Sequence, residues 1–174
     1  TQTKADCLQR VQQRAGDHKP GDWILGHGWN QNIWTSGYGT ASDLDKVAPN
    51  HPVCLTAKSL HASWVNSTAL ELAGIDSDTS DPPGGTIGRD EQGQPTGILY
   101  ESAVQLVEQI LPIPGAAESA EAIEKAQLEL WKMGLTGVHD FDRQICFSAL
   151  QLLERRGRLG LRVLKSIPVE ALDD

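Results

Sequence analysis

The spacing of hydrophobic residues predicts helices along most of the chain. In residues 4–15, KADCLQRVQQRA, apolar side chains recur three to four positions apart, which is the period of an amphipathic helix. The same period predicts further helices at residues 42–49, 63–73, 101–111, 119–133 and 145–156. Ser42 or Asp43 is expected to cap the first of these further helices, and Ser119 is expected to cap the fourth.

Short runs of apolar and β-branched residues, bounded by glycine or proline, predict strands. They lie at residues 23–29, 51–59, 86–89, 95–100, 135–141 and 161–167. Segments 86–89 and 95–100 flank the turn sequence DEQG, so we expect them to pair antiparallel. Segments 135–141 and 161–167 are separated by a helix, so we expect adjacent parallel strands with a right-handed crossover.

A change of pattern divides the chain near PIPGAAE, residues 112–118, which is the best linker sequence. The predicted fold is therefore an α+β region at residues 1–115 and an α/β region at residues 116–174. Two strands are too few for a stable parallel sheet, so the second region is expected to begin a larger sheet. Because the chain opens with Thr1 rather than Met and stops at Asp174, just after a predicted strand, we expect an excised piece of a longer protein.

Composition restricts the possible partners. The 174 residues are 39% hydrophobic and 22% charged, as in soluble globular domains, with a formal net charge of -8. A negative balance without clustered Lys and Arg argues against a nucleic acid or an anionic membrane as partner. No apolar run approaches the roughly 18 residues that a membrane span needs, and no signal peptide is recognisable. Cys7, Cys54 and Cys146 suit neither a disulfide framework nor a CxxC motif, so we expect a reducing, cytoplasmic location.

Four stretches, taken in order, resemble a known family. They are GDWILGHGWNQNIW (21–34), DLDKVAPNHPVCLTAKSLHASWVNSTALELAGI (43–75), DPPGGTIGRDEQGQPTGILYESA (81–103) and GLTGVHDF (134–141). In this order they resemble the YtcJ-like metal-dependent amidohydrolases of amidohydrolase family 3, a group that includes N-substituted formamide deformylase. The glycine-rich SGYGTAS (36–42) departs from the family, which tends to have a shorter Pro-Thr link there.

The resemblance implies a TIM-like (β/α)8 hydrolase barrel with its metal site at the C-terminal ends of the strands. Zinc or another divalent metal would activate water against the C–N bond of a small-molecule amide in the parent enzyme. Residues 1–115 would be an insertion between barrel strands one and two, and segments 135–140 and 161–167 would be strands two and three. The family's ligands are a His-x-His pair on strand one and residues of strands four, five, six and eight. This chain has no His-x-His, so the fragment itself is expected to hold no cofactor and to be inactive alone.

His61 is the first candidate site residue. It is expected to end a strand just before a helix that begins near Ser63, where its ring could bond a substrate oxygen or a metal-bound water. The alternative is a structural corner in which the backbone satisfies His61 and Asn66 bonds the turn. A nucleophile pair with Cys54 is disfavoured, because seven residues of extended strand span about 20 Å.

Three further candidates are His139, Asp140 and Trp29. His139 and Asp140 end a predicted barrel strand and could face a substrate, or form a His–Asp hydrogen bond that braces the strand end. Trp29, beside His27 in a tryptophan-rich segment, could line a mouth for an apolar substrate group, although core packing is the simpler interpretation. His18 and His51 are expected to be solvated, and GGTIG has neither the strand nor the helix of a phosphate loop.

The leading hypothesis is a fragment of a metal-dependent hydrolase acting on a non-peptide carbon–nitrogen bond. The alternative is a free-standing α+β binding module without catalysis, and a third, weaker hypothesis is a thiol enzyme based on Cys54. A fragment that exposes a cut barrel edge would also be expected to self-associate.

Overall fold

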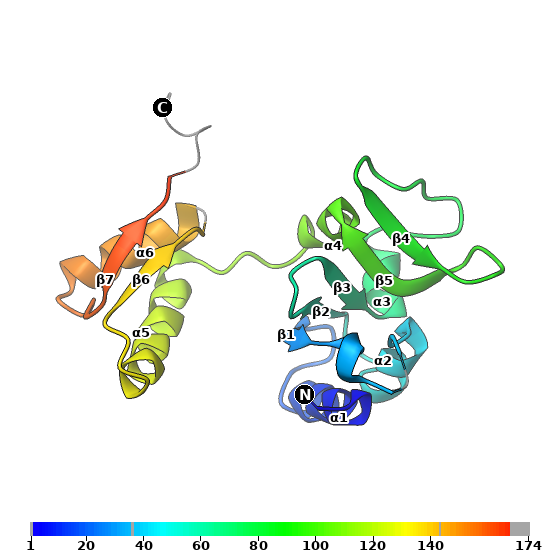
Figure 1. Ribbon diagram of the computed structural model, residues 1–174, viewed down its shortest axis with the longest axis horizontal. Coiled ribbons are helices and arrows are strands. Elements are labelled where there is room, and N and C mark those ends of the chain that lie inside the picture. The colour runs from blue at the N-terminus through cyan, green and yellow to red at the C-terminus, as the bar shows by residue number, and fades with distance from the viewer. Residues whose placement is uncertain (1, 36, 143, 168–174) are drawn as a thin grey trace. The chain divides into compact units, whose positions relative to one another are not determined.

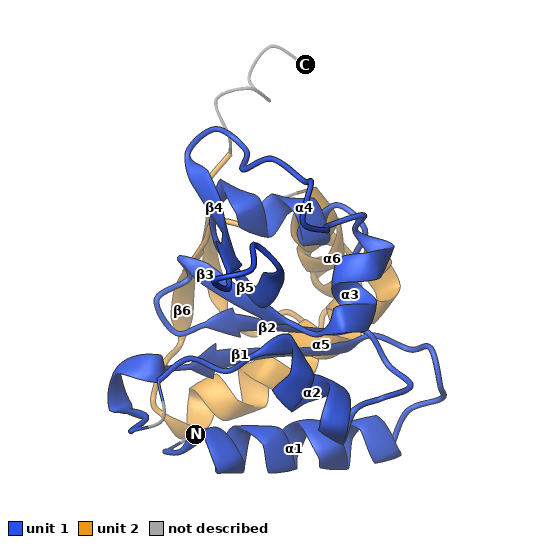
Figure 2. Ribbon diagram, turned by 90° about the vertical axis from the view of Figure 1, so that its right-hand side faces the viewer, with its two compact units in different colours: residues 1–112 blue, residues 113–174 orange. Residues whose placement is uncertain are grey.

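The computed structural model describes residues 2–35, 37–142 and 144–167, which belong to two compact units, Thr1–Pro112 and Ile113–Asp174 (Figure 2). The expectation of an excised piece starts from Thr1 and Asp174. Both residues lie outside the described ranges. The boundary between the units falls within the segment 112–118 that the sequence indicates as a linker.

Unit 1 contains a five-stranded sheet with the order β1-β2-β3-β5-β4 (Figure 1). Its strands are β1 (Ile24–Trp29), β2 (Val53–Ala57), β3 (Ala62–Val65), β4 (Gly85–Arg89) and β5 (Pro95–Glu101). β1 and β2 pair parallel and every other neighbouring pair is antiparallel. The expected antiparallel pairing of segments 86–89 and 95–100 is therefore confirmed.

The helices of unit 1 cover both faces of this sheet. They are α1 (Lys4–Gly16), α2 (Ala41–Val47), α3 (Ser67–Leu72) and α4 (Gln105–Glu108), with the short 3₁₀ helices η1 (Gln31–Ile33) and η2 (Ser102–Val104). One core cluster joins α1 to Val53 and Leu55 of β2, and a second joins Cys54 of the same strand to α3 and α4. β2 is almost wholly buried because alternate side chains point into different clusters.

The predicted helix at 63–73 is wrong in its first part. Residues 62–65 form β3, and the helix begins only at Ser67, with Asn66 as its N-cap. All four side chains of β3 are buried, so this strand lacks the alternation that separates strands from helices in a sequence. The predicted helix at 101–111 is also shorter than expected, since it consists of η2 followed by α4.

Two expected helix starts are also corrected. The N-cap of α2 is Thr40, whose hydroxyl accepts from the backbone N–H of Asp43 while the Asp43 carboxylate accepts from the backbone N–H of Thr40, a complete capping box. Ser42 and Asp43 therefore lie inside the helix. The helix predicted from Ser119 begins at Ala116, because two alanines, the best helix formers, extend its first turn.

Unit 2 is a helix–strand–helix–strand unit: α5 (Ala116–Lys132), β6 (Gly137–Asp140), α6 (Gln144–Arg155) and β7 (Arg162–Lys165). β6 and β7 pair parallel, from Gly137 opposite Arg162 to Asp140 opposite Lys165, which confirms that prediction. Ala120, Ala149 and Leu153 form the buried core between the helices. Along both strands half-buried residues alternate with exposed ones, so one face of this sheet packs on the helices and the other is open.

Candidate functional site

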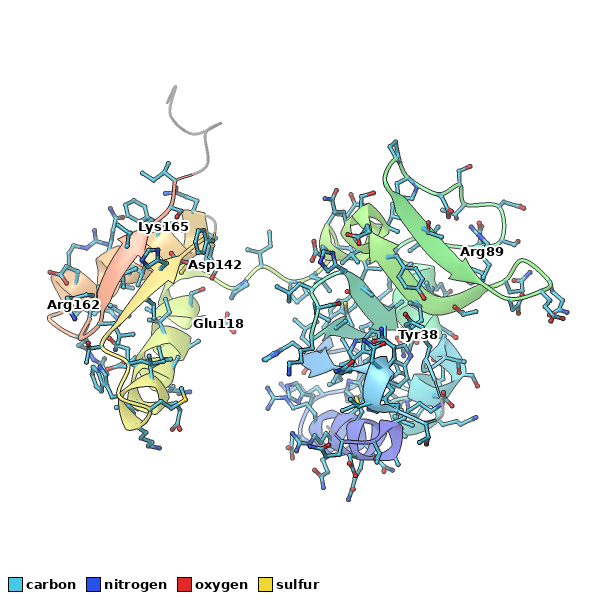
Figure 3. The ribbon with its side chains drawn as sticks, in the orientation of Figure 1. Tyr38, Arg89, Glu118, Asp142, Arg162 and Lys165 are labelled. Carbon is cyan, nitrogen blue, oxygen red and sulfur yellow. The ribbon has the colours of Figure 1, made fainter. Side chains whose placement is uncertain are left out.

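The C-terminal ends of β6 and β7 carry a partly buried ion pair. Lys165 Nζ lies 2.8 Å from Asp140 Oδ2, and the two side chains are only 13% and 10% exposed. Asp140 Oδ1 accepts a hydrogen bond of 2.9 Å from the backbone N–H of Asp142, and Lys165 donates to the Asp142 carbonyl. Figure 3 shows Lys165 and Asp142 at the same end of the two strands. The register of the parallel pair, Asp140 opposite Lys165, brings these groups together.

This environment shifts two pKa values in opposite directions. Burial by itself raises the pKa of Asp140, but the hydrogen bonds from Lys165 and from the Asp142 N–H, with the Lys165 charge, outweigh it, so the net pKa is lowered. Burial, and after it the nearby carboxylates of Asp140 and Asp142, raise the pKa of the Cys146 thiol to about 11. Near neutral pH, Asp140 is therefore a carboxylate and Cys146 a thiol.

These residues do not fit a hydrolytic zinc site. Ligand atoms of Asp140, Asp142 and Cys146 all lie within 4.8 Å of one another. However, the Asp140 carboxylate already forms an ion pair with the Lys165 ammonium, and the raised pKa of the Cys146 thiol makes it hard to deprotonate. The set also includes no histidine. The cluster is better suited to bracing the strand ends than to binding a cation.

His139 and Asp140 lie on opposite faces of β6, since consecutive strand residues alternate. Asp140 faces α6, where its carboxylate interacts with Cys146, whereas His139 is exposed on the open face. The His139 ring centroid lies 6.4 Å from that of Phe141. The Asp140–Lys165 pair thus takes the place of the His–Asp brace that the sequence suggested, and of the two residues only His139 is open to a ligand.

His61 lies in the connection between β2 and β3, directly before β3, so the expectation that it ends a strand is wrong. Its Nδ1 is 3.1 Å from Glu101 Oε2, and the two side chains are 70% and 57% exposed. Sequence reasoning missed Glu101, which follows His61 by forty positions. Only the pairing of β3 with β5, in which Ala62 lies opposite Tyr100, brings them together.

The structure places Trp29 in the core of unit 1. It is 2% exposed, its indole N–H donates to the Leu55 carbonyl at 2.7 Å, and its ring stacks on Trp34 with centroids 5.9 Å apart. Its neighbour His27 is exposed on β1. Packing therefore accounts for Trp29 without a substrate.

Cys54 is buried in β2, and burial raises its thiol pKa to about 11, although a hydrogen bond with Ser63 opposes part of the rise. Cys54 lies opposite Val65 in the β2–β3 pair, at the end of the hairpin remote from His61. A protonated, buried thiol far from the histidine gives no support to a thiol enzyme.

The expectation that His51 is solvated is wrong. His51 is 5% exposed and its Nδ1 lies 3.0 Å from the Asp22 carbonyl oxygen, because the residue sits directly at the entry to the buried strand β2. His18 is partly exposed, with Nδ1 2.8 Å from the Arg14 carbonyl oxygen.

Across the described ranges, every helix is too short or too polar to cross a membrane.

Comparison with known proteins finds relatives that match most of this chain. The chain is 40% identical over 141 residues to the YtcJ amidohydrolase of Bacillus subtilis (strain 168), a match that covers 80% of this chain and 27% of that protein. It is 34% identical over 143 residues to N-substituted formamide deformylase of Arthrobacter pascens, covering 79% of this chain and 26% of the relative. The chain thus spans about a quarter of the length of these relatives.

Two solved structures share the fold. An uncharacterized metal-dependent hydrolase from Pyrococcus furiosus matches with a TM-score of 0.64 and 27% identity, over 99% of this chain and 34% of its own. A second, from Pyrococcus horikoshii OT3, matches with a TM-score of 0.67 and 24% identity, over 99% of this chain and 32% of its own. The model of the amidohydrolase family matches residues 1–174. The chain therefore belongs to the amidohydrolase family.

Proposed function

We propose that this chain is part of a metal-dependent amidohydrolase that hydrolyses a non-peptide carbon–nitrogen bond in a small amide, such as a formamide. In this proposal residues 1–115 are an insertion between barrel strands one and two, and β6 and β7 are strands two and three. Zinc or another divalent metal would be held by side chains of other barrel strands and would supply the activated water. The chain alone would therefore be inactive.

The parallel β6–α6–β7 unit is the observation that carries this proposal. It is the repeating element of a (β/α)8 barrel, and its polar groups lie at the C-terminal strand ends, where such barrels perform chemistry. His139, on the face of β6 away from the helices, is the residue of this unit that we expect to meet a substrate. The likeness to metal-dependent hydrolases over 99% of the chain supports the same assignment.

Metal analysis and a hydrolysis assay test the proposal. We expect the full-length enzyme that contains this sequence to bind a divalent metal stoichiometrically and to release amine from N-alkylformamides or N-acyl amines. The isolated chain should do neither, because a hydrolytic zinc site needs about three protein ligands, and the residues that the structure describes do not provide such a set. Close to one zinc per isolated chain, lost on His61→Ala or His139→Ala, would contradict the assignment of the ligands to other strands.

The alternative of a free-standing binding module predicts a different result. In that case the isolated chain would be the complete functional protein, and no longer gene product with an upstream His-x-His segment would exist. Sequencing the coding region on both sides of the chain distinguishes the two.

A further inference from the structure

Among the described residues, two that are not glycine have a positive φ, and both adjoin His61. Leu60, with φ 67°, belongs to the connection between β2 and β3, and Glu101, with φ 50°, ends β5. The backbone N–H of Glu101 donates to the His61 carbonyl at 3.0 Å, so the two segments are joined directly. We refer to Leu60, His61 and Glu101 as the His61 cluster.

Packing and turn formation do not explain why Leu60 and Glu101 occupy these positions of the His61 cluster. A hydrogen bond of 3.0 Å from the Leu60 N–H to the Ala57 carbonyl closes the turn, and its left-handed position favours glycine or asparagine. Leu60 is 76% exposed, so its side chain adds little to the core. Glu101 also adopts a backbone conformation (φ 50°, ψ -126°) that suits glycine. Strained residues that contribute little to packing are typical of functional sites.

The contact between His61 and Glu101 fixes the chemistry of the imidazole. A carboxylate can only accept, so at the 3.1 Å contact Nδ1 of His61 carries the hydrogen and donates it to Glu101. In the neutral ring Nε2 is then the acceptor. Since an ion pair this exposed adds almost nothing to stability, orientation of the ring is the effect that the contact can have.

We propose that His61 is a substrate-binding residue whose Nε2 accepts a hydrogen bond from the N–H of the substrate amide, and that Glu101 is the residue that positions its ring. This inference rests on the proposed function, because it takes its substrate class from there. An acceptor at this point favours a secondary amide, which has an N–H, over a tertiary amide, which has none. His61 and Glu101 thereby become determinants of specificity.

The first test measures the tautomer in the 174-residue chain. Imidazole ¹⁵N chemical shifts, recorded where the ring is neutral, should show His61 protonated at Nδ1. Glu101→Ala should move the proton towards Nε2, the commoner site, whereas Glu101→Gln, which keeps an acceptor oxygen, should retain the wild-type tautomer. His18, whose Nδ1 faces the Arg14 carbonyl oxygen, is the internal control and should not change in either variant. A wild-type His61 protonated at Nε2 would overturn the inference.

The second test measures kcat/KM of the full-length enzyme for N-propylformamide and for its tertiary analogue, N-methyl-N-propylformamide. His61→Ala should lower kcat/KM for the secondary amide by about tenfold, the worth of one hydrogen bond, and leave the tertiary amide nearly unchanged. Glu101→Ala should act in the same direction and Glu101→Gln should restore most of the loss. Metal content should match the wild type in all variants, and His18→Ala should have no effect.

The outcomes separate the two proposals. A wild-type enzyme that hydrolyses no amide would overturn the proposed function and, with it, the substrate contact. An active enzyme in which His61→Ala changes neither amide, or lowers both equally, would overturn the role of His61 alone.

Discussion

Asp140 shows how one residue depends on its partner. Its carboxylate is 10% exposed and 2.8 Å from the Lys165 ammonium, so removal of either group leaves the other charge without its ionic partner. Because its pKa is lowered on folding from the ordinary value of 3.8, the ionised carboxylate stabilises the folded state. That contribution is fully present above the ordinary pKa and disappears as the pH falls through the lower, folded value.

We therefore predict that Asp140→Asn lowers the free energy of unfolding of unit 2 by about 2 kcal/mol at neutral pH. The difference from the wild type should shrink below about pH 4, as the wild-type carboxyl also loses its charge. Urea unfolding followed by the NMR signals of unit 2 at several pH values measures this. Glu129→Gln, which removes an exposed pair with Lys132, is the control and should have little effect at any pH. A pH-independent difference would contradict the prediction.

At the scale of elements, β5 passes unusually close to its neighbours. Gly97 has φ 95°, and a Cβ at this position would lie 2.4 Å from the Val65 carbonyl oxygen and 2.8 Å from the Ala41 backbone nitrogen. The strand can therefore contact both β3 and the start of α2 only because this residue lacks a side chain.

Gly97→Ala is predicted to destabilise unit 1 by about 3 kcal/mol, since backbone strain adds to overpacking against atoms of the main chain. Thermal and urea unfolding, monitored by tryptophan fluorescence, give the change. Gly16→Ala is the matched control, because Gly16 has no atom within 4 Å of a Cβ and no positive φ. Similar stability of the two variants would show that the main chain around Gly97 adjusts at little cost.

At the scale of the whole molecule, the sheet of unit 2 has two strands in the part of the chain that the structure describes. β6 and β7 pair only with each other within the described ranges, so each leaves an outer edge unpaired. The open face of this sheet and the segments beside it expose Phe141, Leu164 and Ile167, at 75%, 60% and 59%. Unpaired strand edges beside apolar surface favour association between chains.

We predict that the isolated chain self-associates in a concentration-dependent manner, as light scattering can measure. Phe141→Lys with Leu164→Lys should shift the population towards monomer by adding like charges to the surface. Leu72→Lys, which changes a 56% exposed leucine of unit 1, should leave the association unchanged. A strictly monomeric wild-type chain with an ordered, solvent-exposed β7 would contradict this prediction.

The sequence by itself determined the features that depend on nearby residues. Periodicity identified α1 and α6, the turn at Asp90–Gly93 identified the β4–β5 hairpin, and a helix between two apolar runs identified the parallel pairing of β6 and β7. The ordered motifs also indicated the family. Apart from the ordered motifs, which extend from residue 21 to residue 141, each of these signals lies within a few dozen residues, where helix periods and turn chemistry dominate.

Only the tertiary structure decided which distant residues meet. The five-stranded order placed Glu101 beside His61, and the parallel register placed Lys165 rather than His139 against Asp140. Burial on both sides made residues 62–65 a strand where their pattern favoured a helix. These outcomes follow from strand register and from the burial of each face, which depend on the whole sheet and which no local pattern of side chains encodes.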